Sequence, residues 1–129
     1  MIIKQSKVKI IDNSGALVGQ CIHVYGKGRG SIGDEILVAV KKVRRMRSTF
    51  TKGTAKSARI LKGATFPALI VWTKKAYRID DGASLAFSEN AVVLLKKRGG
   101  DPLGSRILGT IPHVCNNKKV VALSKRVVF

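Results

Sequence analysis

The residues of this chain with the clearest chemical purpose are its cations. Between Ile36 and Ile79 the sequence has twelve lysines and arginines and no aspartate or glutamate. Arginine can grip phosphate with two parallel hydrogen bonds, whereas lysine acts as a mobile point charge. The cations of this segment that we expect to bind an anionic partner are Lys41, Lys42, Arg44, Arg45, Arg47, Lys52, Lys56, Arg59, Lys74, Lys75 and Arg78. This pattern favours contact with the phosphates of a nucleic acid.

The charge of the whole chain points the same way. A formal net charge of +18 on 129 residues favours compaction only when a polyanion neutralises it. A membrane surface would require a basic amphipathic helix with an apolar face, and the sequence has none, so we expect no membrane partner. One Trp, two Tyr and four Phe are few for reading single strands base by base. Recognition of backbone and shape is therefore favoured.

Two smaller sets of polar residues lie outside the cationic segment. Asn13 and Ser14 lie in a turn, where they could donate hydrogen bonds to the backbone of an RNA or serve only to form the turn. A second basic cluster near the C-terminal loops could face RNA or a protein partner; its members are Lys96, Lys97, Arg98 and Arg106.

Cysteine and histidine occur in two pairs, Cys21-x-His23 and His113-x-Cys115. In an extended chain each pair would share a face, and together the pairs form the Cys₂His₂ set that zinc favours. Neither spacing is usual for zinc, and Cys21 suits a small buried hydrophobe. We therefore expect no metal and no other cofactor, and no disulfide in an intracellular RNA-bound protein.

Catalytic and nucleotide-binding sites are also not expected. The seven acids are scattered, and the adjacent Asp80 and Asp81 would point to opposite sides of a strand. Gly28, Gly30 and Gly33 match G-x-G-x-x-G, but a strand pattern follows them where a dinucleotide fold would have a helix. We interpret these glycines as a flexible basic turn, with no small-molecule substrate.

Alternating apolar residues predict the elements that must position the cations. The expected strands are 7–11, 16–25, 36–43, 68–72 and 91–95. The turn at 12–15 joins the first two into a hairpin, and Asp81-Gly82 marks another. In the second strand, alternation places Cys21 and His23 on one face. Apolar residues on both faces of 68–72 predict a central strand with Trp72 buried.

Short strands separated by turn signals predict the fold class. The chain is expected to be mainly β, a small five-stranded antiparallel β-barrel forming a single domain over residues 1–129. A basic arm at about 41–66 would leave the barrel between the third and fourth strands. Its polar centre suits a long hairpin or a loop that becomes ordered on its partner.

Several motifs together resemble a known family. DNSGA at 12–16, CIHV at 21–24, IGD at 32–34 and the segment 68–94 are similar to the universal family of large ribosomal subunit protein fourteen. PLGSRILG at 102–109 resembles the proline-aliphatic-glycine-threonine-arginine motif that follows in that family. The resemblance extends over nearly the whole chain.

This resemblance implies a five-stranded β-barrel with a protruding β-ribbon and short C-terminal helical turns. It implies a structural, non-enzymatic constituent of the large ribosomal subunit that binds large-subunit rRNA. The implied partners also include small-subunit rRNA across an intersubunit bridge, the neighbouring large-subunit proteins three and nineteen, and the ribosome silencing factor.

The chain departs from bacterial relatives in two places. Its arm is longer, and Leu61-Lys62-Gly63-Ala64 lacks the aspartate of the bacterial turn. The region after Gly109 is shorter, which leaves open whether the silencing-factor surface is retained. These departures resemble mitochondrial members, so we expect a ribosome of the mitochondrial matrix, with a bacterial or chloroplast ribosome as the alternative. The alternative function, a free OB-like nucleic-acid chaperone, would require exposed aromatic residues on one sheet face.

Overall fold

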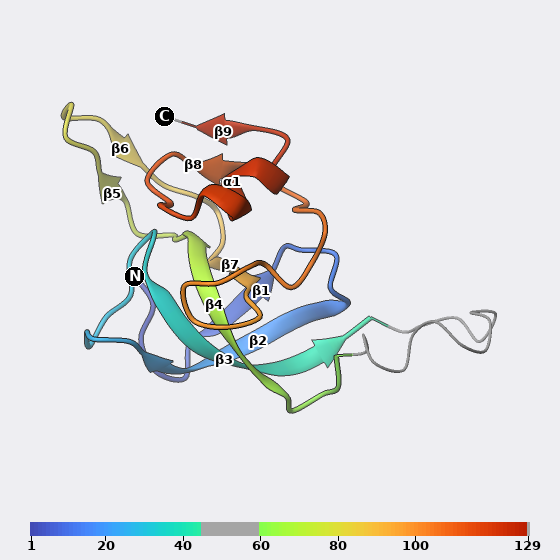
Figure 1. Ribbon diagram of the computed structural model, residues 1–129. Helices are drawn as coiled ribbons and strands as arrows, with labels where there is room; N and C mark the ends of the chain where they lie inside the picture. Colours follow the sequence, from blue (N-terminus) through green and yellow to red (C-terminus); the bar gives the residue numbers. More distant parts are fainter. Residues whose placement is uncertain (45–59, 129) are drawn as a thin grey trace.

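The computed structural model describes residues 1–44 and 60–128. Its elements are β1 (Lys7–Ile10), β2 (Ala16–Val24), β3 (Glu35–Val43), β4 (Thr65–Trp72), β5 (Tyr77–Arg78), β6 (Ser84–Leu85), β7 (Ala91–Leu94), β8 (Ile111–Pro112), α1 (Lys118–Leu123) and β9 (Val127–Val128). Figure 1 shows the long strands curled around one another, with α1, β8 and β9 together above them. The β5–β6 hairpin projects to one side. Most of the predicted arm lies outside the described residues.

Five strands close into a barrel in the order β1-β2-β3-β4-β7, which confirms the predicted five-stranded barrel. Four of the neighbouring pairs are antiparallel, but β1 and β7 run parallel. The antiparallel prediction fails at this seam because an odd number of strands cannot alternate in direction around a closed ring.

The barrel interior is built by alternating side chains. On β3, Ile36, Val38 and Val40 are fully buried and meet apolar residues from the other four strands. Gly19 of β2 lies against this row, and a Cβ at Gly19 would lie 2.2 Å from Cγ1 of Val38. The packing therefore leaves no room for a side chain at position 19.

A second apolar cluster, which we call the outer core, lies on the far side of β4 and β7. Both strands are buried on both faces where they border this cluster, as the apolar run at 68–72 predicted for β4. Along β4, Ile70 packs inside the barrel, whereas the neighbouring Val71 packs in the outer core. The members of the outer core are Ile11, Ile32, Leu69, Val71, Ala91, Val93, Leu95, Ile107, Ile111, Cys115 and Val120.

Two β-bulges change which face some side chains occupy. The β2–β3 register shifts between Cys21 and His23, which leaves Ile22 as an extra residue. Cys21 is buried in the barrel while His23 is exposed, so the prediction that they share a face is wrong. A similar shift between Ile70 and Trp72 places Trp72 against the outer core, where it is half-buried and not fully buried as predicted.

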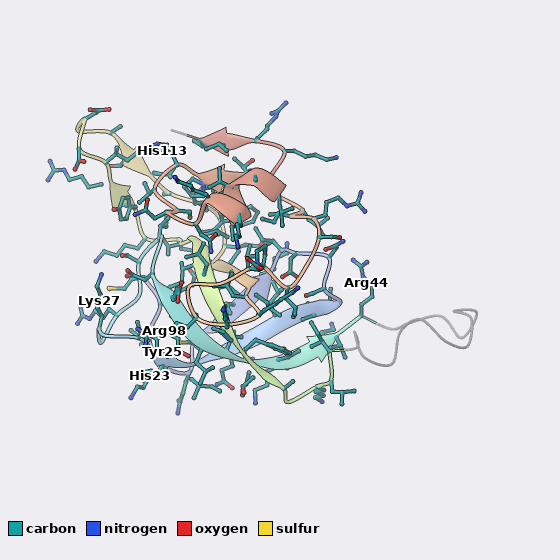
Figure 2. All side chains as sticks on the ribbon, in the orientation of Figure 1. His23, Tyr25, Lys27, Arg44, Arg98 and His113 are labelled. Atoms are coloured by element: carbon teal, nitrogen blue, oxygen red, sulfur yellow. The ribbon has the colours of Figure 1, made fainter. Side chains whose placement is uncertain are left out.

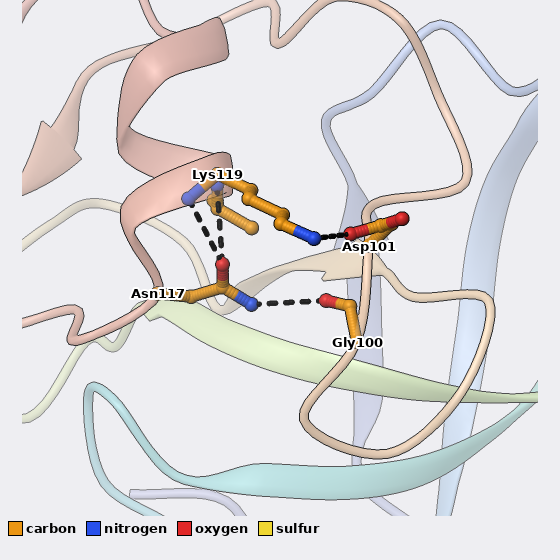
Figure 3. Close-up of polar contacts among 5 residues, drawn as sticks. Gly100, Asp101, Asn117 and Lys119 are labelled. Atoms are coloured by element: carbon orange, nitrogen blue, oxygen red, sulfur yellow. Dashed lines mark hydrogen bonds and ion pairs between the residues drawn. The ribbon is translucent and has the colours of Figure 1, made fainter.

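The C-terminal segment confirms the predicted short helical turns with one six-residue helix, α1. The Oδ1 atom of its N-cap, Asn117, accepts hydrogen bonds from the N–H groups of Lys119 (3.1 Å) and Val120 (3.3 Å). The Nδ2 atom of Asn117 donates to the carbonyl oxygen of Gly100 at 3.2 Å (Figure 3). Lys119 also forms an ion pair with Asp101. These contacts fasten α1 to the loop that follows β7.

Within residues 1–44 and 60–128, no helix has the length and hydropathy needed to cross a membrane.

Candidate nucleic-acid interface

The predicted cations fall on several surfaces. Arg45, Arg47, Lys52, Lys56 and Arg59 lie outside the described residues. The others are all exposed: Lys41, Lys42, Arg44, Lys74, Lys75, Arg78, Lys96, Lys97, Arg98 and Arg106. The ion pairs seen in the described part of the chain use Lys9, Lys27 and Lys119, so they neutralise none of these predicted cations.

Three of the predicted cations border one groove, which we call the β1 groove. Its volume is about 640 Å³, and the apolar residues that line it include Leu17, Val18 and Leu108. The cations in its lining are Lys7, Lys9, Lys42, Arg44 and Lys74. The exposed acid in the lining, Glu89, forms an ion pair of 3.0 Å with Lys9. The groove thus carries a strong excess of positive charge beside an apolar surface.

Strand geometry explains how these cations converge. On β1, Lys7 and Lys9 alternate with buried residues and therefore point outward. Arg44 follows β3, and its N–H donates to the carbonyl oxygen of Gly15 at 2.7 Å, which fixes the base of the arm beside the 12–15 turn. Lys74 follows β4. The sequence prediction omitted Lys7 and Lys9, although the alternation of KVKI already indicated that both are exposed.

Adjacent cations in the sequence can serve different surfaces. Lys75 and Arg78 border a hollow of about 180 Å³ with Arg29, separate from the groove that Lys74 lines. Arg106 borders a third hollow, of about 410 Å³. The cations of these hollows that the sequence prediction missed are Arg29, Lys125 and Arg126.

The predicted 12–15 turn is formed by its own side chains. Asp12, which is only 4% exposed, accepts hydrogen bonds from the Ser14 N–H (3.0 Å) and the Ser14 hydroxyl. Its other carboxylate oxygen accepts from the N–H of Leu94 at 3.1 Å, which attaches the turn to β7. Burial raises the pKa of Asp12, and these hydrogen bonds oppose that rise. Gly15 completes the turn with a φ of 102°.

Asn13 joins this turn to the 102–109 segment. Its Oδ1 atom accepts hydrogen bonds from the N–H groups of Ser105 (2.8 Å) and Arg106 (3.0 Å). Its Nδ2 atom donates to the Ser105 hydroxyl at 2.9 Å. Asn13 therefore has a clear role in the fold, and contact of Asn13 and Ser14 with RNA stays a prediction.

Trp72 and Tyr25 each contact a neighbouring side chain. Trp72 stacks on Phe87 with ring centroids 5.4 Å apart and an interplanar angle of 12°. The guanidinium carbon of Arg98 lies 4.2 Å from the centroid of the Tyr25 ring. The Trp and Tyr residues that could form a stacking surface, Trp72, Tyr25 and Tyr77, are all half-buried. This arrangement disfavours a free OB-like chaperone.

The two cysteines lie in different cores, Cys21 in the barrel and Cys115 in the outer core. Both are buried free thiols. Burial raises the pKa of Cys115 to about 12 and also raises the pKa of Cys21. Among the described residues, no group of three or more His, Cys, Asp or Glu side chains could hold a metal ion.

A closed, strongly basic β-barrel with a cationic groove is typical of the proteins that assemble with nucleic acid. The family model for "Ribosomal protein L14p/L23e" matches residues 1–128. "Large ribosomal subunit protein uL14m" of Neurospora crassa is 38% identical over 120 residues, which cover 92% of this chain and 91% of the relative. The protein of the same name from Schizosaccharomyces pombe is 38% identical over 125 residues, 94% of each chain. The chain belongs to the L14p/L23e family of ribosomal proteins.

Proposed function

We propose that this protein is a structural constituent of the mitochondrial large ribosomal subunit and that it binds rRNA through the β1 groove and the arm. Family membership supports a structural, non-enzymatic role in the ribosome. The suffix m in the names of both relatives denotes a mitochondrial ribosomal protein and supports the matrix location. Two observations support treating residues 1–129 as one domain. The family model matches almost the whole chain, and the two cores share β4 and β7.

The observation that carries the rRNA proposal is the convergence of Lys7, Lys9, Lys42, Arg44 and Lys74 around one groove. Only Lys9 is neutralised by an acid of that groove. The groove also lies at the base of the arm, so arm and groove can follow one continuous stretch of phosphate backbone. If about six phosphates are neutralised, log K should fall against log salt with a slope of about −4 to −5.

The finer partners rest on the family resemblance and are proposals of the same kind. They are small-subunit rRNA across an intersubunit bridge, large-subunit proteins three and nineteen, and the ribosome silencing factor. The cationic hollow of Arg29, Lys75 and Arg78 shares no lining residue with the β1 groove, which supports a second RNA-facing surface. In Figure 2, Arg44 and Arg98 lie on opposite sides of the barrel, which is compatible with contacts in two directions.

The test is a double charge reversal, Lys42→Glu with Lys74→Glu. A matched control reverses two exposed lysines outside the groove, Lys4→Glu with Lys118→Glu. Tagged proteins are expressed in a host mitochondrion, and large subunits are sedimented through a high-salt gradient. We expect the groove variant to be lost from the subunit and the control to be retained.

Equal retention of the two variants would contradict binding through the β1 groove. Release of the wild-type protein as a free pool at moderate salt would instead support the chaperone alternative.

A further inference from the structure

Three side chains from two distant segments form a cluster on the barrel surface, which we call the Tyr25 cluster: His23, Tyr25 and Arg98. The bulge at Ile22 turns His23 outward, so that its ring meets the Tyr25 ring edge-on, with centroids 5.5 Å apart and an interplanar angle of 82°. From the loop after β7, the Arg98 guanidinium lies over the Tyr25 ring at 4.2 Å. Figure 2 labels the three side chains next to one another.

The loop that carries Arg98 is held in place by its backbone. The N–H of Gly99 donates to both carboxylate oxygens of Glu35, each at 3.1 Å. The carbonyl oxygen of Glu35 accepts from the N–H of Tyr25 at 3.3 Å, so one residue of β3 positions both halves of the stack. Within the loop, the N–H of Gly100 donates to the carbonyl oxygen of Lys97 at 3.0 Å. Arg98 is therefore presented by a fixed turn.

Stacking on Tyr25 leaves a specific surface for a ligand. The guanidinium carbon lies 4.2 Å from the centroid of the ring that it covers, and Arg98 is exposed. A guanidinium plane can stack on a nucleobase as well as on an aromatic side chain. Lys96 and Lys97, exposed in the same loop, can reach the neighbouring phosphates. The nearby carboxylate, Glu35, is already engaged by Gly99.

We propose that the Tyr25 cluster is a stacking site for one unpaired RNA nucleotide. The base of this nucleotide lies on the side of the Arg98 guanidinium that faces away from Tyr25, and the adjacent phosphates contact Lys96 and Lys97. Three consecutive cations favour RNA over a protein partner at this site. The inference deepens the proposed function, because it assigns recognition of a base to this cluster and binding of the backbone to the β1 groove.

The test compares Arg98→Lys with the matched control Arg106→Lys, which makes the same substitution in a different hollow. Both variants keep the charge of the chain, and only the first removes a guanidinium stacked on a tyrosine. The probes are a single-stranded oligoribonucleotide of about eight nucleotides, the same strand with abasic sites, and a duplex of equal length. Affinities are measured by fluorescence anisotropy over a range of salt concentrations, and thermal melts check that each variant folds.

For Arg98→Lys we expect affinity for the unpaired strand to fall about fivefold or more, with an unchanged salt slope. Binding to the duplex and to the abasic strand should not change, and Tyr25→Leu should reproduce the loss. Any effect of Arg106→Lys should be equal on all three probes, because Arg106 would bind phosphate by its charge and would not stack on a base.

Wild-type binding by Arg98→Lys would overturn the proposal, because a point charge would then suffice. An equal loss on all three probes would also overturn it. If Arg98→Glu impaired subunit assembly while leaving all RNA affinities intact, a protein partner would replace RNA at this site. The β1-groove variants do not touch this cluster, so failure here is distinguishable from failure of the proposed function.

Discussion

The barrel interior and the outer core share two strands but are closed in different ways. Residues of β4 and β7 alternate between them, and backbone hydrogen bonds surround the barrel interior on every side. The outer core is closed by the C-terminal segment. Scattered backbone hydrogen bonds, such as Leu108 N–H to the Ile11 carbonyl oxygen, and the side chains of Asn13 and Asn117 attach this segment to the rest. A layer held in this way should open before the barrel does.

This difference matters for the β1 groove, because the groove lies where the two parts meet. Lys7 and Lys9 belong to a barrel strand, whereas Leu108 belongs to the segment that Asn13 holds. Opening of the outer layer should therefore remove one wall of the groove while its cations stay on the barrel.

The largest expected effect is on the barrel itself, from Gly19→Ala. The added Cβ would lie 2.2 Å from Val38 Cγ1, inside a fully buried core, so we expect a loss of about 3 kcal/mol in the free energy of unfolding. Urea denaturation measures this loss. Gly28→Ala is the control, since a Cβ there would meet nothing within 4 Å. Equal stabilities of the two variants would mean that the barrel interior is not tightly packed.

A matched pair on β7 separates the two cores directly. Val92 packs in the barrel and Val93 in the outer core, and both are fully buried. Each change to Ala should cost about 2 kcal/mol. Hydrogen exchange of the Val121 amide, which bonds to Asn117 in α1, should become about 30-fold faster in Val93→Ala and stay unchanged in Val92→Ala. Equal acceleration in both would show that the two cores open as one unit.

A smaller effect is expected from Asn13→Ala, which removes three hydrogen bonds to Ser105 and Arg106. Because the site is exposed, we expect a loss of about 1.5 kcal/mol, seen as faster exchange at the Leu108 amide. Affinity for duplex RNA should also fall, since the groove loses its Leu108 wall. The Asn13→Asp variant keeps the acceptor and should recover most of the stability. Unchanged exchange at the Leu108 amide would show that the Asn13 side chain does not hold the 102–109 segment in place.

The smallest effect concerns the cap of α1. Asn117→Ala removes both the cap and the bond to Gly100, and should cost about 1 kcal/mol. Asn117→Asp keeps the cap acceptor but loses the donor to Gly100, so its stability should lie between those of the wild type and Asn117→Ala. Thermal denaturation of the wild type and the two variants measures this order of stability. Lys119→Ala should change little, because its ion pair with Asp101 is exposed. A larger effect of Lys119→Ala than of Asn117→Ala would contradict this view of the attachment.

The sequence predicted the strands of the barrel closely, because alternation is a local signal. The burial of β4 on both faces was also predicted from its apolar run. The bulges at Ile22 and before Trp72 could not be predicted from the sequence, since a bulge depends on the register of the partner strand. These bulges explain why Cys21 and His23 face opposite ways and why Trp72 joins the outer core.

By itself, the sequence determined the charge of the surface and the periodicity of the strands, which are properties of single residues and their neighbours. It also carried the motifs that led to the family. Only the tertiary structure decided which cations lie together. Closing the barrel brings Lys7, Lys42 and Lys74 to one groove and separates Lys74 from Lys75. It also brings Arg98 onto Tyr25 across 73 residues of sequence (98 − 25). Such pairings depend on strand register and long-range packing, which no local pattern encodes.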